Sequence, residues 1–235
     1  MSYQALARVY DGFFEADYHE KIVRRYRRIL QRFGVADGKI LDLGCGTGRL
    51  ALAFARAGAQ VCGVDPDADM IACAKEKSRD LPILWRVATL PQIAGEGEFD
   101  AITASLDVVN HITREDELLD TFCAARRLLR RGGVLVFDIN TEKKFREVYG
   151  DNSYIFREVD ALAAWENDYD EKREICRFTV DVFTKKGETY ERKTDIIYER
   201  MYRDERIRFL LRAAGFYTIL WQGMDQGTRH IYIAK

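Results

Sequence analysis

The residues with the clearest chemical meaning are three glycines at alternate positions, Gly44, Gly46 and Gly48, followed about twenty residues later by the carboxylate of Asp65. The glycines end the apolar run KILDLG, where they allow the backbone to turn sharply and to approach a ligand closely. An acid at the end of the next strand is placed to accept hydrogen bonds from ribose hydroxyls. These residues therefore predict a site for a cofactor that contains a nucleoside.

The spacing of the glycines distinguishes two classes of such cofactor. Dinucleotides are bound through GxGxxG, but here the position of the third glycine is Arg49 and the pattern is GxGxG. Asp42, just before the loop, would repel a phosphate and could pair with an ammonium group. The stretch favours a cofactor without a pyrophosphate and argues against a nicotinamide-dependent oxidoreductase.

A parallel sheet must position these residues, because short apolar runs alternate with helical segments from Lys39 onward. Strands are expected at KILDLG, QVCGVD, ILWRVA, FDAITAS and GVLVFDIN, with helices over 17–33, 49–57, 67–77 and 114–129. A helix over 204–213 and two closing strands, FYTILWQ and RHIYIAK, complete the pattern. The expected fold class is α/β, with a doubly wound, mostly parallel, seven-stranded sheet.

The alternation of strand and helix patterns is interrupted between Thr141 and Met201. There Cys176, Phe178 and Val180 alternate with polar residues, and KKGE supplies a turn, so the segment predicts an antiparallel hairpin with one or two further strands upstream. We expect a core formed by residues 1–140 and 202–235, with an N-terminal helical cap over 1–36. Residues 141–201 are expected to form an antiparallel β subdomain inserted after the fifth strand.

The composition limits the classes of partner. The 37 basic and 38 acidic residues leave a net charge of -1, so no global positive field favours binding to nucleic acid. The N-terminus does not resemble a signal peptide and no eighteen apolar residues run together, which predicts a cytoplasmic protein without a membrane partner. The five cysteines form no CxxC pair, and no His or carboxylate cluster has ligand spacing, so no metal site is expected.

The stretch ILDLGCGTG resembles the first motif of the class I S-adenosylmethionine-dependent methyltransferases. The resemblance continues through VCGVDPD, FDAITASLDVVNHI and LLRRGGVLVFDIN, and it covers residues 40–140 and the closing strands. The chain is also similar to the small bacterial methyltransferases related to glycine and amino-sugar N-methyltransferases. These share a β insertion after the fifth strand and an N-terminal YD element, here Tyr10 and Asp11. The cofactor that the resemblance implies is S-adenosyl-L-methionine.

Carried over residue by residue, the resemblance implies a cofactor site made of Tyr10, Asp42, Gly44, Cys45, Gly46, Gly48, Asp65, Pro66, Met70, Ala88, Thr89 and Leu106. Gly44, Cys45 and Gly46 would lie under the methionine part of the cofactor. Asp42 would lie near its ammonium group, directly or through a water molecule. The alternative for Asp42 is that it only caps the next helix.

The nucleoside part of the cofactor would be held by residues after the second and third strands. Asp65 would accept hydrogen bonds from both ribose hydroxyls, and Pro66 and Met70 would enclose the adenine, although both also fit ordinary turn and core positions. Many members of the family carry an acid after the third strand that accepts the adenine amino group. This chain has Ala88 and Thr89 there, so either the Thr89 hydroxyl or the backbone would take over that contact.

The loop SLDVVNHI would border the transferred methyl group. Its ionisable residues, Asp107 and His111, are the catalytic candidates, because a positioned imidazole can take a proton from an acceptor. The alternative is that Asn110 and His111 satisfy backbone groups of the loop. The loop lacks the Asn or Asp, two prolines and aromatic residue that nucleobase amino methyltransferases use there, which counts against methylation of DNA or RNA bases.

We therefore expect a methyltransferase that acts on nitrogen or oxygen of a small-molecule acceptor by direct in-line displacement. The aromatic and cationic residues of the insertion suit either a substrate lid or a dimer contact, and the expected state is a monomer or homodimer. Two alternatives remain. One is an RNA or protein methyltransferase that uses the basic face of the helix over 17–33, and the other is a non-catalytic module that binds S-adenosylmethionine.

Overall fold

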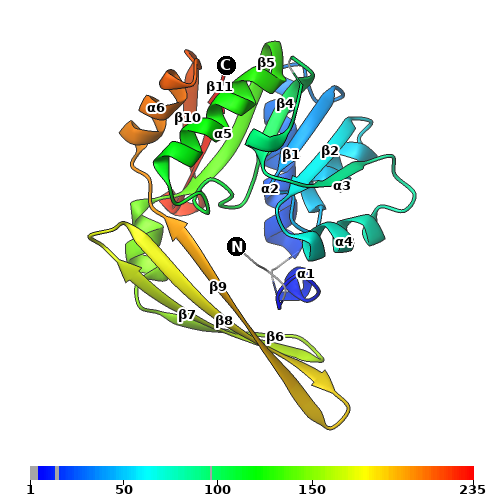
Figure 1. Ribbon diagram of the computed structural model, residues 1–235, viewed down its shortest axis with the longest axis vertical. Coiled ribbons are helices and arrows are strands. Elements are labelled where there is room, and N and C mark those ends of the chain that lie inside the picture. Colours follow the sequence, from blue (N-terminus) through cyan, green and yellow to red (C-terminus); the bar gives the residue numbers. More distant parts are fainter. Residues whose placement is uncertain (1–4, 14–15, 96) are drawn as a thin grey trace.

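The computed structural model describes residues 5–13, 16–95 and 97–235, which form two sheets that meet end to end (Figure 1). The larger sheet has seven strands in the order β10-β11-β5-β4-β1-β2-β3. Its strands are β1 (Lys39–Leu43), β2 (Gln60–Asp65), β3 (Leu84–Val87), β4 (Phe99–Ala104), β5 (Leu129–Asn140), β10 (Ile219–Met224) and β11 (Arg229–Ala234). Strands β1 to β5 pair in parallel and β11 is antiparallel to both of its neighbours. The predicted doubly wound, mostly parallel sheet is confirmed.

Helices cover both faces of this sheet because its central strands are buried on both sides. Ile40 packs in one core with α2 (Ala16–Arg32) and α3 (Arg49–Arg56). Its neighbour Leu41 packs in the opposite core with α5 (Glu115–Leu128) and α6 (Asp204–Ala213). Helix α4 (Ala68–Lys77) contacts β2 and β3. None of the described helices combines the length and the apolar character needed to span a bilayer.

Two strands begin three or more residues away from the expected position. Strand β5 begins at Leu129, before the glycines, because Leu129 pairs with Phe99 and the register then shifts. Gly132 takes a φ of 84°, which lets the chain accommodate that irregularity. Strand β10 begins three residues late, at Ile219, because Phe216 is buried in the core instead of joining the strand.

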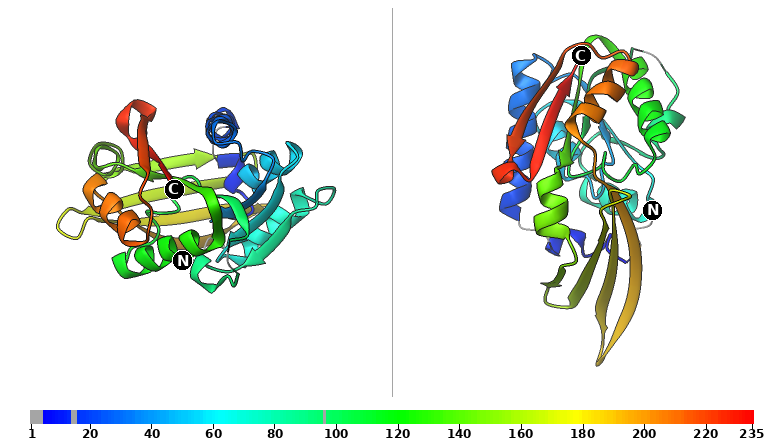
Figure 2. Two further views of the ribbon diagram at one scale, coloured as in Figure 1. Left: turned by 90° about the horizontal axis from the view of Figure 1, so that it is seen from above. Right: turned by 90° about the vertical axis from the view of Figure 1, so that its left-hand side faces the viewer.

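The insertion forms a second sheet of four antiparallel strands, β6 (Ser153–Arg157), β7 (Ala161–Asp170), β8 (Ile175–Lys186) and β9 (Thr189–Arg200). It leaves the core after β5 through a short π-helical turn, η2 (Lys144–Tyr149), and returns directly to α6. The predicted hairpin is the pair β8–β9, which turns at Gly187 with a φ of 64°. Figure 2 shows that this sheet projects from the end of the larger sheet where the parallel strands terminate.

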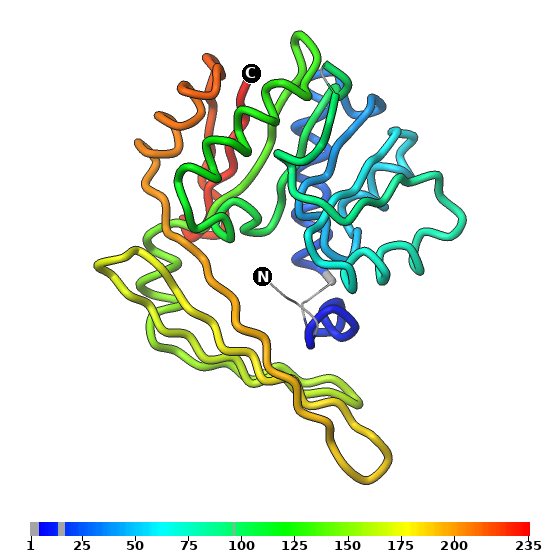
Figure 3. The backbone as a smooth tube through the Cα atoms, viewed as in Figure 1, coloured from blue at the N-terminus to red at the C-terminus, as the bar shows by residue number. Residues whose placement is uncertain are grey.

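The N-terminal segment, residues 5–13, lies where the two sheets meet (Figure 3). Leu6 and Phe13, the latter in α1 (Tyr10–Phe13), are buried in the core of the four-stranded sheet. The backbone N–H groups of Ala5 and Leu6 donate to Oδ2 of Asp195 on β9, at 3.0 and 3.1 Å. The segment is therefore fastened to the insertion, and the carboxyl ends of the parallel strands face it.

Candidate active site

A cavity of about 660 Å³ opens at the carboxyl ends of β1, β2 and β4, where ligands of doubly wound folds are expected. It brings together most of the residues singled out in the sequence. These are Tyr10, Gly44, Cys45, Gly46, Asp65, Pro66, Met70, Ala88, Thr89, Leu106 and His111. Asp42, Gly48 and Asp107 do not line the cavity.

The glycine loop has the left-handed backbone that its sequence requires. The φ angles are 60° at Gly44 and 52° at Gly46, a region that side chains other than glycine rarely adopt. A Cβ atom at Gly44 would lie 2.5 Å from Val108, so the loop after β4 approaches this position too closely for any side chain. At Gly46 nothing lies within 4 Å of such an atom, because this glycine faces the cavity.

Asp65 stands at the end of β2 and connects the loop to the next helix. Its Oδ2 accepts from the Gly46 N–H and its Oδ1 from the Asp67 N–H, both at 2.9 Å. Burial raises the pKa of Asp65 above its ordinary value, although both backbone N–H groups oppose the shift. Each carboxylate oxygen keeps a second lone pair, so Asp65 can still accept from ligand hydroxyls.

Asp42 lies beneath the loop and not on the wall of the cavity. Its Oδ1 accepts from the Thr103 hydroxyl at 2.8 Å, its Oδ2 makes no hydrogen bond of normal geometry, and the Ala51 backbone N–H in the first turn of α3 acts to lower the pKa of the carboxyl group. Burial raises the pKa of Asp42 to about 7. A buried acceptor without a partner is costly, so this oxygen suits a site that takes up a cationic amino group through a water molecule. The acceptor oxygens of Asp42 and Asp65 therefore fit a cofactor that carries both a ribose and an ammonium group.

The residues expected around the adenine also line the cavity. Met70 is buried, whereas Pro66 is exposed at the mouth. Ala88 and Thr89 precede the short helix η1 (Leu90–Gln92), and the Thr89 N–H donates to the side chain of Gln92 at 3.1 Å. Gly48 has a different place, because it precedes α3 and a Cβ atom there would lie 2.6 Å from Trp85.

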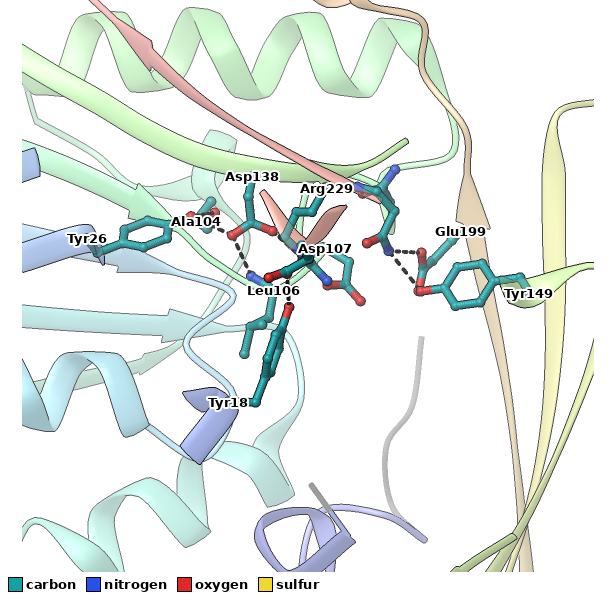
Figure 4. A network of polar contacts seen from close by, with 12 residues as sticks. Tyr18, Tyr26, Ala104, Leu106, Asp107, Asp138, Tyr149, Glu199 and Arg229 are labelled. Carbon is teal, nitrogen blue, oxygen red and sulfur yellow. Dashed lines mark hydrogen bonds and ion pairs between the residues drawn. The ribbon is translucent and has the colours of Figure 1, made fainter. Parts of the chain in front are cut away.

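The loop after β4 is held in an unusual conformation by one buried carboxylate. Leu106 and Asp107 have φ angles of 61° and 68°, which are uncommon for residues other than glycine. Asp138 at the end of β5 accepts from the N–H of Leu106 at 3.0 Å, from that of Asp107 at 3.3 Å, and from the Tyr26 hydroxyl at 2.7 Å. Nη1 of Arg229 donates to the same carboxylate (Figure 4). Asp138 therefore positions the loop that borders the cavity.

Of the two catalytic candidates, Asp107 is paired. Its Oδ1 lies 2.8 Å from Nη2 of Arg229, whose side chain is 3% exposed. Burial alone would raise the pKa of Asp107, but the positive charge of Arg229 lowers it below its ordinary value. Asp107 therefore remains a carboxylate at neutral pH and is a poor proton acceptor there.

His111 lines the cavity, and its Nδ1 lies 3.3 Å from the backbone oxygen of Tyr198 on β9. Burial lowers the pKa of His111, with Asp107 opposing the shift, so the imidazole is neutral at pH 7. The alternative role expected for this loop was hydrogen bonding to backbone groups. The neighbouring residue Asn110 has this role. The Asn110 side chain accepts from the Asn140 N–H at 2.8 Å and donates to the backbone oxygen of Arg200 at 2.9 Å.

Several residues of this region carried no functional prediction in the sequence. Asp138 and Asn140 end a buried strand, and polar residues at that position were an available signal. Glu199 and Arg229 gave no such signal, because an inserted strand and a closing strand bring them to the site. One atom each of Asp107, His111 and Glu199 lie within 4.8 Å of one another, a grouping that spacing along the chain did not reveal.

The comparisons with known proteins agree with this geometry. The family described as "Methyltransferase domain" matches residues 40–133. The putative methyltransferase YqeM of Bacillus subtilis (strain 168) is 28% identical over 92% of this chain and 87% of its own length. The ubiquinone biosynthesis O-methyltransferase of Rhodopseudomonas palustris (strain HaA2) is 38% identical over 48% of this chain and 44% of its own length.

Solved structures share the whole fold. An S-adenosylmethionine-dependent methyltransferase from Clostridium acetobutylicum ATCC 824 superposes with a TM-score of 0.83 at 24% identity, over 98% of this chain and 95% of that one. CalS10, an amino pentose methyltransferase from Micromonospora echinaspora solved with S-adenosylmethionine bound, has a TM-score of 0.76 at 19% identity, over 98% and 96%. Residues 40–133, which include the motif ILDLGCGTG at the cavity, thus match a methyltransferase domain family, and the whole chain shares the fold of solved S-adenosylmethionine-dependent methyltransferases.

Proposed function

We propose that this enzyme transfers the methyl group of S-adenosylmethionine to nitrogen or oxygen of a small-molecule acceptor. The cofactor supplies an activated methyl group on a sulfonium, so the protein has to hold the acceptor in line and to exclude water. The observation that carries the proposal is that one cavity includes both the glycine loop and His111. Since His111 also contacts β9 of the inserted sheet, the acceptor would enter between the core and that sheet.

The cofactor roles inferred from the sequence follow this arrangement. We assign Asp65 to the ribose, Gly44, Cys45 and Gly46 to the methionine part, and the pair Ala88 and Thr89 to the adenine. Pro66, Met70, Leu106 and Tyr10 would complete the walls of the site, which all four line. Asp42 would act from beneath the loop, through its unpartnered oxygen.

Relatives differ in the atom that they methylate. The relative from Rhodopseudomonas palustris is named an O-methyltransferase, and KedS8 from Streptoalloteichus, a structural neighbour with a TM-score of 0.74 at 17% identity, is a sugar N-methyltransferase. Both chemistries need an enclosed site for one nucleophilic group. Glu199, which lies near His111, and its partner Asn140 are both buried, which supports an acceptor small enough to enter such a site.

Calorimetry should show that S-adenosylmethionine and S-adenosylhomocysteine bind, and that NAD does not. The reason is the GxGxG spacing, together with the Asp42 carboxylate beneath the loop. A screen of amines, hydroxy acids and amino sugars, read by release of S-adenosylhomocysteine, would then identify the acceptor. Tight NAD binding without binding of either sulfur nucleoside would refute the proposed function, and cofactor binding without turnover of any acceptor would favour the non-catalytic alternative.

Nucleic acid should not be retained at physiological salt. Six basic residues, Lys21, Arg24, Arg25, Arg27, Arg28 and Arg32, lie on α2, but the net charge of the whole chain is -1. Binding to phosphates depends on an extended basic surface, and it falls steeply as salt rises. A filter-binding assay with tRNA and duplex DNA measures this. Salt-sensitive retention of RNA would instead support the RNA methyltransferase alternative, with α2 as the contact.

We also propose that residues 5–13 and the insertion over 141–201 form a lid on the bound cofactor. Asp11 connects residues 5–13 to the core, because its carboxylate accepts from the Thr47 hydroxyl at 2.7 Å and pairs with Arg49 at 2.8 Å and Lys77 at 2.5 Å. These partners belong to the glycine loop and to helices α3 and α4. Tyr3, which the sequence also suggested for the lid, lies outside the described residues.

Hydrogen exchange tests the lid. With S-adenosylhomocysteine bound, we expect added protection near Tyr10 and along the insertion as well as at 44–48. Asp11→Ala should remove the added protection of the insertion and leave that of the glycine loop in place. If protection appears only at 44–48 and at Asp65, there is no lid, and the inserted sheet is better explained as a dimer contact.

A further inference from the structure

The cluster of Asp107, His111 and Glu199 joins the two sheets beside the cofactor cavity. Asp107 and His111 belong to the loop after β4, whereas Glu199 is carried by β9 of the insertion. One potential ligand atom of each residue lies within 4.8 Å of the other two. Since His111 also lines the cavity, the Glu199 carboxyl group stands immediately beyond the end where the methyl group would be transferred.

Glu199 is buried and receives only neutral donors. Glu199 is 4% exposed, and its Oε2 accepts from Nδ2 of Asn140 at 2.9 Å. The Tyr149 hydroxyl is 3.4 Å from Oε1, and Figure 4 shows the Tyr149 side chain pointing toward the Glu199 carboxyl group. Among residues 5–13, 16–95 and 97–235, no Lys or Arg forms an ion pair with Glu199. A buried carboxylate without an ion-pair partner favours the uptake of either a proton or a cation.

The carboxylates around this cluster outnumber the cations. Asp107, Asp138, Glu199 and the partly exposed Asp225 face two cations, Arg229 and Lys144. Arg229 is already held by Asp107 and Asp138, and the buried His111 is neutral at pH 7. Burial, with repulsion by Asp107, raises the pKa of Glu199 to about 8.

We propose that Glu199, with Asp107 and His111, binds the cationic amino group of the methyl acceptor, and that the Glu199 carboxylate receives the proton that this group must lose before methylation. The inference rests on the proposed function and narrows the acceptor to an amine. It makes the inserted sheet a direct part of the transfer site, because β9 supplies the carboxylate. An ammonium group suits the site because it supplies a positive charge and several N–H donors.

The step balances in protons and electrons. The acceptor enters as R–NH3⁺ and ionised Glu199 takes one proton, which leaves R–NH2 and a neutral carboxyl group. The nitrogen lone pair then attacks the methyl carbon, and the carbon–sulfur bond breaks with its electron pair remaining on sulfur. The products are R–NH2⁺–CH3 and S-adenosylhomocysteine, after which Glu199 releases its proton to water.

Sinefungin provides a test that does not require the acceptor. This analogue carries C–NH3⁺ where the cofactor carries S⁺–CH3, so it presents an ammonium group at the position of transfer, whereas S-adenosylhomocysteine is neutral there. Calorimetry would measure both dissociation constants at pH 6.5 and pH 8.0. The ratio of the two isolates the contribution of the ammonium group, since the remaining contacts are shared.

In the wild-type protein, the preference for sinefungin over S-adenosylhomocysteine should increase about tenfold between pH 6.5 and pH 8.0. The sign follows from the raised pKa of Glu199, because at lower pH the ammonium group must displace the Glu199 proton. The other titratable and charged groups that face Glu199 or its neighbours are Asp107, His111, Lys144, Tyr149, Cys176, Asp225 and Arg229. All of these groups are retained in Glu199→Gln, so the difference between this variant and the wild type gives the contribution of Glu199 to the pH dependence.

Glu199→Gln should remove most of this pH dependence and weaken sinefungin binding at pH 8.0 by about tenfold. Binding of S-adenosylhomocysteine should stay within about twofold, because this nucleoside carries no ammonium group at the position of transfer. Glutamine can still accept from Asn140, and a thermal melt checks that the variant folds. The matched control is Glu191→Gln on the same strand, an exposed position where the wild-type pH dependence should persist.

Three results would overturn the proposal. If S-adenosylhomocysteine binds but the sinefungin preference in Glu199→Gln equals that of the wild type, Glu199 does not receive the ammonium group, although the proposed function stands. If MnCl2 titration shows one Mn²⁺ bound per chain that is lost in Glu199→Gln, the cluster is a metal site. If neither nucleoside binds the wild-type protein, the proposed function fails together with the inference.

Discussion

Replacing Arg229 with methionine should lower the free energy of unfolding by about 3–5 kcal/mol, the usual cost of breaking a buried ion pair from one side. The Arg229 side chain is 3% exposed and pairs with Asp138, which is fully buried, and with Asp107. The methionine would leave both carboxylates without their ion-pair partner. Urea denaturation of wild type and variant at pH 7 measures the loss.

Two further variants show whether charge is the cause. Arg24→Met removes an arginine from the surface of α2, where its pair with Glu20 is mostly exposed, and should change stability by no more than about 0.5 kcal/mol. The double change Arg229→Met with Asp138→Asn should recover part of the loss, because it removes one unpaired carboxylate. A double variant as unstable as Arg229→Met alone would mean that packing, and not charge, explains the effect.

The loss of stability caused by Arg229→Met should also depend on pH. Arg229 lowers the pKa of Asp107 below its ordinary value of 3.8 in the folded protein. A depressed pKa contributes stability that is present above 3.8 and is lost as pH falls through the folded value. The difference between wild type and variant should therefore be full at neutral pH and narrow as the pH falls below 3.8.

Asp65→Ala should weaken the binding of S-adenosylhomocysteine by about 1.5–3 kcal/mol, which is roughly ten- to hundredfold in the dissociation constant. Two contributions add to this loss. The ribose hydroxyls would lose a charged acceptor, and the Gly46 N–H would lose the partner that fixes the loop. Isothermal titration calorimetry measures the change directly.

Two further variants test whether the loss of affinity is specific to the Asp65 carboxylate. Asp65→Asn keeps one acceptor oxygen and should show a smaller loss than alanine. Asp69→Ala removes an exposed carboxylate in the first turn of α4 and should bind as the wild type does. An unchanged affinity in Asp65→Ala would exclude Asp65 from the ribose site.

The fold and the cofactor were predictable because their signals are local. The glycine pattern, the strand before it and the acid after the next strand all lie within residues 39–65, and βαβ units fold mainly through such neighbouring segments. Continuous apolar strands required a sheet covered on both faces, as Ile40 and Leu41 show by packing in opposite cores. The hairpin β8–β9 followed in the same way from alternation around one turn.

The transfer site depended on contacts between distant parts of the chain. Asp107 carried a catalytic prediction, yet its partner Arg229 comes from the last strand, and that pairing leaves Asp107 ionised at neutral pH. Asn140 meets Glu199 across 59 positions, through an inserted sheet whose orientation no local pattern encodes. The sequence by itself determined the fold class and which cofactor binds, because spacing within a few tens of residues controls the backbone there. Which carboxylates are paired, buried or poised to accept a proton was decided by the tertiary structure, since burial and neighbouring charge control the pKa of each group.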